Sequence, residues 1–376
     1  MTDRIFLSPP DMGGDELELI KKVFASNFIA PAGPMLVAFE QAMTEYLEIP
    51  HVVAVSSGTA AMHLALRHIG VGTGDIVLAS SLTFIGSVSP AVFQGAEVVF
   101  VDSDMFTWNM NPDLLAEGIE DSRRRGKIPK AVIPTDLYGQ CADLDRINEI
   151  CNKYEIPVLN DSAESLGSLY KGRAAGKGAY ASIYSFNGNK IITTSGGGLL
   201  ASEDKKLIDH ARKLATQSRD DFPYYHHTEI GYNYRMSNVL AAIGLGQLQV
   251  LDQKVEMRRK INRLYRKYLG DVAGISFMPE AIYGKTNCWL TVIQFDPERI
   301  SVTPEEVRAA LEIENIEARP VWKPMHLQPV FAKNSVIGGE VSEALFRNGL
   351  CLPSGSAMTG RDVERVSQII KESLRD

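Results

Sequence analysis

The stretch Tyr184-Ser185-Phe186-Asn187-Gly188-Asn189-Lys190-Ile191-Ile192-Thr193-Thr194-Ser195-Gly196-Gly197-Gly198 places one lysine between an apolar run and a glycine turn. The run before it, Ala181–Phe186, is apolar and partly aromatic, which is typical of a buried strand. A lysine amine that is desolvated at such a position becomes a nucleophile for a carbonyl compound. Lys190 is therefore a candidate catalytic residue, and the rest of the chain indicates what it acts on.

Six further apolar runs of the same kind lie elsewhere between residues 50 and 202, separated by helical patterns over 59–69, 84–94 and 143–154. This strand–helix alternation predicts an α/β fold: a mostly parallel, seven-stranded sheet with helices on both faces. In such sheets, ligands bind at the carboxyl ends of the strands. The seven expected strands are His51–Val55, Ile76–Ser80, Glu97–Asp102, Ala131–Thr135, Pro157–Asp161, Ala181–Phe186 and Gly198–Ser202.

Polar residues follow two of these strands. Ser57-Gly58-Thr59 opens directly into a helix, where backbone N–H groups and hydroxyls bind anions, although Ser57 could equally be only the N-cap. Asp161 could bind a metal, act as a base, pair with a protonated heterocycle or cap a helix. Because Asn160-Asp161-Ser162-Ala163-Glu164 lacks histidine or further aspartate at ligand spacing, no metal is expected.

An anion site, a strand-end acid and a strand-end lysine together meet the needs of pyridoxal 5′-phosphate. The helix N-terminus would bind the phosphate, Asp161 the pyridinium nitrogen, and Lys190 the aldehyde as a Schiff base. Phe84, at the end of another strand, could stack on the ring. The sequence therefore predicts this cofactor.

Composition excludes several other classes of protein. The 376 residues include 39 basic and 46 acidic side chains, a net charge of −7, so a nucleic-acid or anionic-membrane partner is not expected. The four cysteines are far apart, which fits a reducing compartment, and the N-terminal residues lack the apolar core of a signal peptide. We expect a soluble, cytoplasmic protein.

The last third of the chain has fewer clear strands. A long helical pattern over Asn238–Leu269 has a basic second half, which we interpret as a solvated face, and a terminal amphipathic helix is expected over Arg361–Leu374. At this length two domains are expected. We predict a large cofactor-binding domain over residues 1–255 and a smaller α+β domain over residues 256–376.

These motifs resemble those of the DegT/DnrJ/EryC1/StrS sugar aminotransferases, which are pyridoxal-phosphate enzymes of fold type I. The similarity runs over nearly the whole chain. The chain departs from the commonest family pattern at Asn187-Gly188-Asn189 before the lysine, where many members have Ser-Phe-His-Pro. The matching segments are Asn27-Phe28-Ile29-Ala30-Pro31, Ser57-Gly58-Thr59-Ala60-Ala61, Leu137-Tyr138-Gly139-Gln140, Asp161-Ser162-Ala163-Glu164-Ser165, Gly231-Tyr232-Asn233-Tyr234-Arg235, Arg319-Pro320-Val321-Trp322-Lys323-Pro324-Met325-His326 and Pro353-Ser354-Gly355.

The resemblance implies roles for individual residues. Lys190 would hold the cofactor and shuttle a proton, and Asp161 would keep the pyridine nitrogen protonated. Glu164 would approach the hydroxyl edge of the ring, and Asn233 would reach the phosphate of a neighbouring subunit, which implies a homodimer with shared active sites. The remaining implied phosphate ligands are Ser57, Gly58, Thr59 and Ser185.

The resemblance also implies a substrate. The segment before Lys190 is most similar, together with four others, to members that aminate C4 of UDP-4-keto-6-deoxy-N-acetylglucosamine, as in bacillosamine biosynthesis, with L-glutamate as amino donor. The four others are Ser8-Pro9-Pro10, Asn27–Pro31, Arg319–His326 and Leu352–Gly355. Another keto sugar nucleotide, such as a dTDP-linked one, and a non-catalytic sugar-nucleotide-binding protein are the alternatives. Asp136, where relatives often have histidine, has no assigned role. The expected substrate-binding residues are Asn27, Phe28, Ile29, Ala30, Asn187, Arg319, Trp322, Lys323 and His326.

Overall fold

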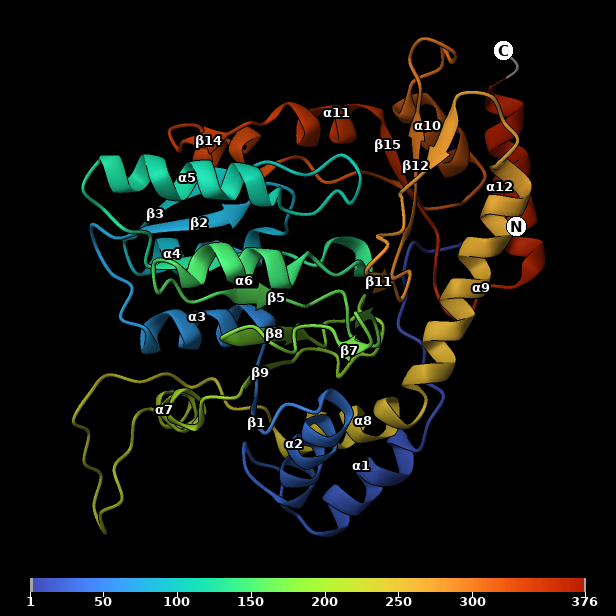
Figure 1. The fold of residues 1–376 in the computed structure, drawn as a ribbon. Helices are drawn as coiled ribbons and strands as arrows, with labels where there is room; N and C mark the ends of the chain where they lie inside the picture. Colours follow the sequence, from blue (N-terminus) through green and yellow to red (C-terminus); the bar gives the residue numbers. More distant parts are fainter. Residues whose placement is uncertain (1–2, 375–376) are drawn as a thin grey trace.

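The computed structural model describes residues 3–374, and its centre is a wide sheet (Figure 1). One four-stranded ladder has the order β1-β9-β8-β5, and a second has the order β14-β3-β2-β4. Parallel bridges between Val132 and Val158 and between Thr135 and Asp161 join the two ladders at β4 and β5. The strands are β1 (His51–Val55), β2 (Ile76–Ser80), β3 (Glu97–Val101), β4 (Ala131–Ile133), β5 (Leu159–Asp161), β8 (Ala181–Ser185), β9 (Gly198–Ser202) and β14 (Val336–Ile337).

The prediction of a mostly parallel sheet is confirmed, with two additions. Strand β9 runs antiparallel to both of its neighbours, β1 and β8, whereas β5–β8, β2–β4 and β2–β3 pair in parallel. A short eighth strand, β14, pairs in parallel with β3 at the edge of the sheet. The last third of the chain therefore also contributes a strand to the large sheet.

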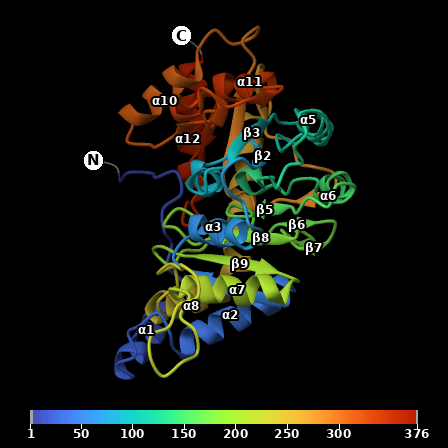
Figure 2. The ribbon, with the colours of Figure 1, turned by 90° about the vertical axis from the view of Figure 1, so that its left-hand side faces the viewer.

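Helices cover both faces of the sheet (Figures 1 and 2). Alternate side chains of each strand point to opposite faces, so Val77 and Ala79 pack in one hydrophobic cluster and Ile76 and Leu78 in another. The first face is covered by α3 (Gly58–His68), α4 (Ser89–Phe93) and α7 (Lys205–Ala215), and the second by α2 (Pro34–Leu47), α5 (Pro112–Arg124), α6 (Leu144–Asn152) and α8 (Asn238–Gln249).

A second, antiparallel sheet has the order β10-β12-β15-β13 and packs against helices of the last third of the chain. Its strands are β10 (Ile275–Phe277), β12 (Thr291–Phe295), β13 (Arg319–Pro320) and β15 (Gly349–Leu352), and its helices are α9 (Leu251–Leu269), α10 (Pro304–Ile313) and α12 (Gly360–Ser373). The remaining elements are α1 (Glu16–Ala25), α11 (Glu340–Asn348) and the small sheet of β6 (Leu169–Tyr170), β7 (Arg173–Ala174) and β11 (Gly284–Lys285). The boundary placed between residues 255 and 256 falls inside α9 and stays a prediction.

Two helix predictions need correction. The single helix expected over residues 238–269 is two helices, α8 and α9, separated at Val250. The helix expected over residues 84–94 is a 3₁₀ turn, Ile85–Ser87, followed by α4. Pro90 explains this second break, because proline lacks an N–H and is tolerated only in the first turn of a helix.

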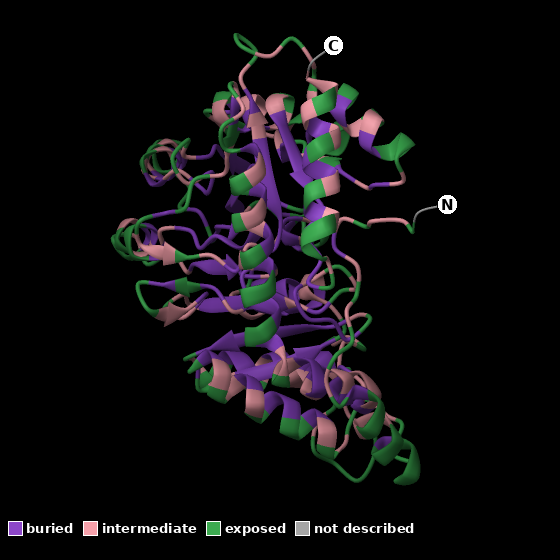
Figure 3. Cartoon of the chain, turned by 90° about the vertical axis from the view of Figure 1, so that its right-hand side faces the viewer, coloured by how far each residue is buried: buried purple, intermediate pink, exposed green. Residues whose placement is uncertain are grey.

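The basic stretch of α9 is only partly a solvated face. Most of its basic residues are exposed, as the green segments of Figure 3 show for the helix, but Lys254 and Arg258 are buried. Arg258 donates hydrogen bonds to the carbonyl oxygens of Trp289 (2.6 Å) and Ser354 (3.0 Å), and to Ser8 Oγ (3.1 Å). Lys254 Nζ lies 3.3 Å from a carboxylate oxygen of Asp11. The interpretation of these two side chains as solvent-exposed is therefore wrong, because both hold the N-terminal segment against α9.

Candidate active site

A cavity of about 350 Å³ opens at the carboxyl ends of β1, β5 and β8, where the α/β rule places a ligand. It is therefore built by segments that are far apart in the sequence. The predicted residues that line it are Ser57, Gly58, Thr59, Phe84, Asp161, Glu164, Ser185, Asn187, Lys190 and Trp322.

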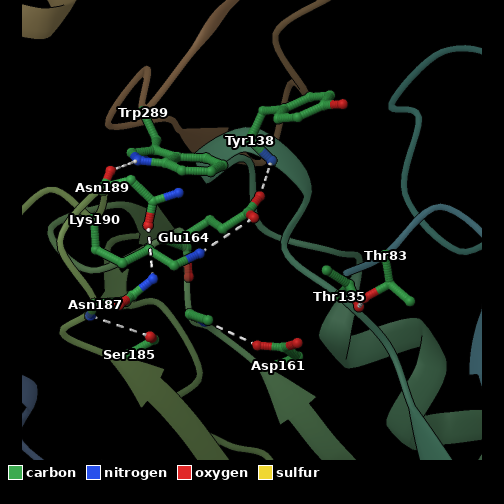
Figure 4. Close-up of polar contacts among 12 residues, drawn as sticks. Thr83, Thr135, Tyr138, Asp161, Glu164, Ser185, Asn187, Asn189, Lys190 and Trp289 are labelled. Carbon is green, nitrogen blue, oxygen red and sulfur yellow. Dashed lines mark hydrogen bonds and ion pairs between the residues drawn. The ribbon is translucent and has the colours of Figure 1, made fainter. Parts of the chain in front are cut away.

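Lys190 extends into this cavity from the irregular loop that follows β8 (Figure 4). Its Nζ lies 3.4 Å from Glu164 Oε1 and 4.4 Å from the centre of the Trp289 ring. The side chains of Lys190 and Glu164 are only 11% and 3% exposed. The amine is thus largely shielded from water and lies between a carboxylate and an aromatic face. Because little water competes there, the attraction of the amine to both groups is stronger than it would be in solution.

Glu164 is positioned by the main chain opposite it. The backbone N–H of Tyr138 donates to Glu164 Oε2 at 2.7 Å, which leaves the other oxygen for Lys190. Burial raises the pKa of Glu164 to about 7, although the positive charge of Lys190 acts in the opposite direction. Glu164 can therefore both release and accept a proton near neutral pH.

Asp161 ends β5 and is buried below the lysine. Its Oδ1 accepts a hydrogen bond from the N–H of Ala163 (3.0 Å) and its Oδ2 from Ser87 Oγ. Thr83 Oγ1 in turn contacts Ser87 Oγ (2.7 Å) and Thr135 Oγ1 (2.8 Å), so a row of hydroxyls orients the acid. Burial raises the pKa of Asp161, and a cationic partner would offset that cost.

The N-terminus of α3 forms the opposite wall of the cavity. Ser57 is the N-cap and its side chain accepts the N–H of Ala60, so the capping role considered from the sequence is present. The N–H groups of Gly58 and Thr59, in the first turn, have no partner within the helix. Gly58 lies so close to β8 that a Cβ there would come within 3.2 Å of Ser185 Cβ. This close approach brings the Ser185 hydroxyl and the helix N-terminus to one place, which suits a phosphate group.

The chemistry of these donors fits pyridoxal 5′-phosphate. The helix N-terminus with Ser185 would hold the phosphate. Asp161 retains acceptor capacity for a protonated ring nitrogen, because each of its two oxygens accepts one described hydrogen bond and can accept another. Lys190 supplies the amine. Bound pyridoxal phosphate supplies an aldehyde and an electron-withdrawing ring that stabilises a carbanion.

A second cavity, of about 490 Å³, adjoins the first. The two share Phe84, Asn189, Trp289 and Trp322 as lining residues. The second is also lined by residues 6–10 of the N-terminal segment and by Arg319, which forms an ion pair with Glu317 at 2.8 Å. The predicted residues Phe84, Trp322 and Arg319 are thus brought to one continuous space.

Seven of the predicted substrate- or cofactor-binding residues lie outside both cavities of the single chain. His326 is not a lining residue of either cavity, because its ring contacts Ser81 Oγ (2.6 Å) and Glu343 Oε1 (3.2 Å). Its placement beside the substrate stays a prediction that these contacts do not support. The other positions outside both cavities are Lys323, Asn233 and the segment of Asn27, Phe28, Ile29 and Ala30, all of them exposed apart from the half-buried Ala30.

Sequence analysis did not single out two contributors to this site, Trp289 and Tyr138, and assigned no role to a third residue, Asp136. The Trp289 ring contacts Lys190 from about 100 residues away in the sequence, and the backbone N–H of Tyr138 binds Glu164 from 26 residues away. Asp136 is fully buried beneath the site and accepts hydrogen bonds from Ser165 Oγ (2.6 Å) and the N–H of Ala142 (2.9 Å). Burial raises the pKa of Asp136 to about 6. Two signals pointed to Asp136: its position after β4, since strand ends carry the site, and the histidine that relatives often have there.

Between residues 3 and 374, no group of three or more His, Cys, Asp or Glu side chains is arranged to hold a metal ion. Within the same part of the chain, no helix combines the length and apolar character needed to cross a bilayer.

Comparison with known proteins places the site in a family. The profile of the DegT/DnrJ/EryC1/StrS aminotransferase family matches residues 10–371. The Bacillus subtilis (strain 168) protein EpsN, whose name assigns it to the pyridoxal phosphate-dependent aminotransferases, is 47% identical over 98% of this chain and 96% of its own. A GDP-perosamine synthase of Caulobacter vibrioides is 34% identical over 99% of this chain and 98% of its own.

Solved structures agree with this result. The crystal structure of the aminotransferase TlmJ from Streptoalloteichus hindustanus superposes with a TM-score of 0.92 at 30% identity, over 99% of each chain. The chain therefore belongs to the DegT/DnrJ/EryC1/StrS aminotransferase family and is a pyridoxal 5′-phosphate-dependent sugar aminotransferase of fold type I.

Proposed function

We propose that the enzyme transfers the amino group of L-glutamate to C4 of a UDP-linked 4-keto-6-deoxy-N-acetylhexosamine, in bacillosamine-type glycan biosynthesis. One water supplies the keto oxygen of the departing 2-oxoglutarate, and the keto oxygen of the sugar leaves as water, so the amino group and the keto oxygen are exchanged with no net change in water. The observation that carries the proposal is the second cavity, which continues the first past Trp289 and Trp322 and is lined by aromatic side chains and Arg319. Aromatic faces and a guanidinium suit a nucleotide diphosphate.

In this proposal the residues of the chain divide the work. Lys190 moves a proton between the substrate carbon and the cofactor, and Glu164, 3.4 Å away, takes part in holding the lysine amine in place. Asp161 holds the proton on the ring nitrogen, and its burial keeps water from competing for that contact. Asn187, on the rim beside Lys190, contacts the sugar.

We further propose a homodimer with shared active sites in the cytoplasm. Asn233 and the segment over residues 27–30 lie outside both cavities of their own chain, and Phe28 and Ile29 are about half exposed. A partner subunit would cover these apolar side chains and receive Asn233 at its phosphate site. The four free cysteines suit a reducing compartment.

The test is a substrate panel. The cofactor-loaded enzyme is incubated with glutamate and with UDP-, GDP- and dTDP-linked 4-keto and 3-keto sugars, and the products are resolved by NMR. We expect turnover of the UDP-linked 4-keto-6-deoxy-N-acetylhexosamine and none by Lys190→Ala. Preference for a GDP-linked sugar, as the name of the Caulobacter relative would favour, or for a 3-keto sugar would refute the proposed substrate. Binding without turnover of any sugar would instead indicate a non-catalytic protein.

A further inference from the structure

The carbonyl oxygen of Asn189, directly before Lys190, accepts two hydrogen bonds from remote parts of the chain. Ser8 Oγ donates at 2.7 Å from 181 residues away, and Trp289 Nε1 donates at 2.8 Å from 100 residues away. Figure 4 shows the indole N–H of Trp289 pointing at Asn189 while its ring lies beside the lysine amine. Both donors therefore act on the peptide that carries Lys190.

This peptide has little other support from regular structure. Strand β8 ends at Ser185, and residues 187–190 lie outside the ladders of the sheet. The described main-chain hydrogen bond of Lys190 is a local one, from its N–H to the carbonyl oxygen of Asn187 at 3.0 Å. The flanking residues Phe186 and Thr194 are held by main-chain hydrogen bonds, so the peptide between Asn189 and Lys190 is the part whose orientation this local bond leaves least constrained. The two donors from outside the turn fix its orientation and hence the direction of the lysine side chain.

Both donors are themselves anchored to α9 by Arg258. The guanidinium donates to Ser8 Oγ (3.1 Å) and to the carbonyl oxygen of Trp289 (2.6 Å). It also donates to the carbonyl oxygen of Ser354 (3.0 Å), whose N–H binds the carbonyl oxygen of Leu7 (2.8 Å). Arg258 is completely buried, so these bonds do not compete with water. The two donors to Asn189 are thus held by one side chain of a long, regular helix.

We propose that Ser8 and Trp289 are positioning residues that orient Lys190 through the carbonyl oxygen of Asn189. The N-terminal segment thereby becomes part of the catalytic apparatus without touching the reacting atoms. The inference rests on the proposed role of Lys190 as the reactive amine, and it is independent of the sugar nucleotide.

The test compares Ser8→Ala and Trp289→Phe, each of which removes one donor. Ser8→Thr keeps the hydroxyl and is the rescue variant. Ser373→Ala is the matched control, because Ser373 Oγ also donates to a main-chain carbonyl, that of Ile369 at 2.8 Å, far along the chain in α12. Two quantities are measured: amide hydrogen exchange of the peptide containing residues 187–190 in cofactor-free protein, and the rate of borohydride-trappable attachment of pyridoxal phosphate to Lys190.

In Ser8→Ala and in Trp289→Phe, we expect the amide hydrogens of this peptide to exchange about fivefold faster than in the wild type. We expect the cofactor to attach to Lys190 about fivefold more slowly. Both changes correspond to the loss of one hydrogen bond. Ser8→Thr and Ser373→Ala should keep wild-type rates for both. Wild-type exchange in Ser8→Ala would overturn the proposal even if Trp289→Phe folds poorly, and so would faster exchange with an unchanged rate of attachment. Attachment of the cofactor to another lysine in the wild-type protein would refute the role of Lys190 itself, and mapping the adduct separates this failure from the others.

Discussion

Glu164→Gln tests the electrostatics of the site in the cofactor-free protein. Burial raises the pKa of Glu164 from 4.5 to about 7, so the ionised carboxylate is disfavoured in the folded protein. Below pH 4.5, Glu164 is protonated in both the folded and the unfolded protein. As the pH rises above 4.5, the carboxyl ionises in the unfolded protein first, so the folded protein loses stability, and this loss is complete above pH 7. At 1.36 kcal/mol per pKa unit, the full cost is about 3 kcal/mol. Glutamine is uncharged, keeps an acceptor for the N–H of Tyr138 and avoids this cost.

We therefore expect Glu164→Gln to gain stability relative to wild type by about 2 kcal/mol more at pH 8 than at pH 5. Urea unfolding of both proteins at the two pH values, followed by tryptophan fluorescence at a fixed protein concentration, measures this difference. Glu97→Gln is the control, because Glu97 is exposed and should respond equally at both pH values. A stability difference between Glu164→Gln and wild type that does not change with pH, or that shrinks from pH 5 to pH 8, would refute the reasoning.

The remaining predictions concern catalysis. Asp161→Asn should lower kcat at least a hundredfold with the fold and cofactor occupancy intact, because the ring nitrogen loses its anionic partner; near-normal turnover would show that Asp161 only caps a helix. Mixing Lys190→Ala with Asn233→Ala subunits should restore activity if sites are shared, and proven subunit exchange without recovery would contradict this. Asn187→Ala should raise the KM for the keto sugar but not that for glutamate in initial-rate assays. His326→Ala should instead lower the melting temperature, because the His326 ring contacts Ser81 and Glu343; a change confined to the KM for the sugar would contradict its placement.

Much of the fold could be predicted because local signals and global packing agree. Strands β1, β2 and β9 have the predicted bounds, since each is a buried apolar run with turn residues on either side. Because ligands bind at the carboxyl ends of the strands, Asp161 and Lys190 could be predicted to share a site from their positions after strands alone, and both line the same cavity. Breaks within helices were harder, because the sequence around Val250 continues a helical pattern on both sides.

The rest of the site could not be predicted because it depends on contacts between distant segments. Neighbours in sequence need not share a site: Trp322 lines both cavities, whereas the 3₁₀ turn Met325–Leu327 directs His326 toward Ser81. Similarly, nothing local distinguishes the buried Arg258 from the exposed basic residues of α9. Its burial follows from the N-terminal segment that packs over it, which brings Ser8 to its guanidinium.

The most direct test of the central claim is to identify the lysine that binds the cofactor. The purified protein is loaded with pyridoxal phosphate and reduced with borohydride, and the covalent adduct is mapped by peptide mass spectrometry. The structure predicts a single adduct on Lys190, the lysine that lines the cavity with Asp161, Glu164 and the N-terminus of α3. It also predicts that Lys190→Ala retains non-covalent cofactor binding and forms no adduct. An adduct on any other lysine of the wild-type protein would contradict the account.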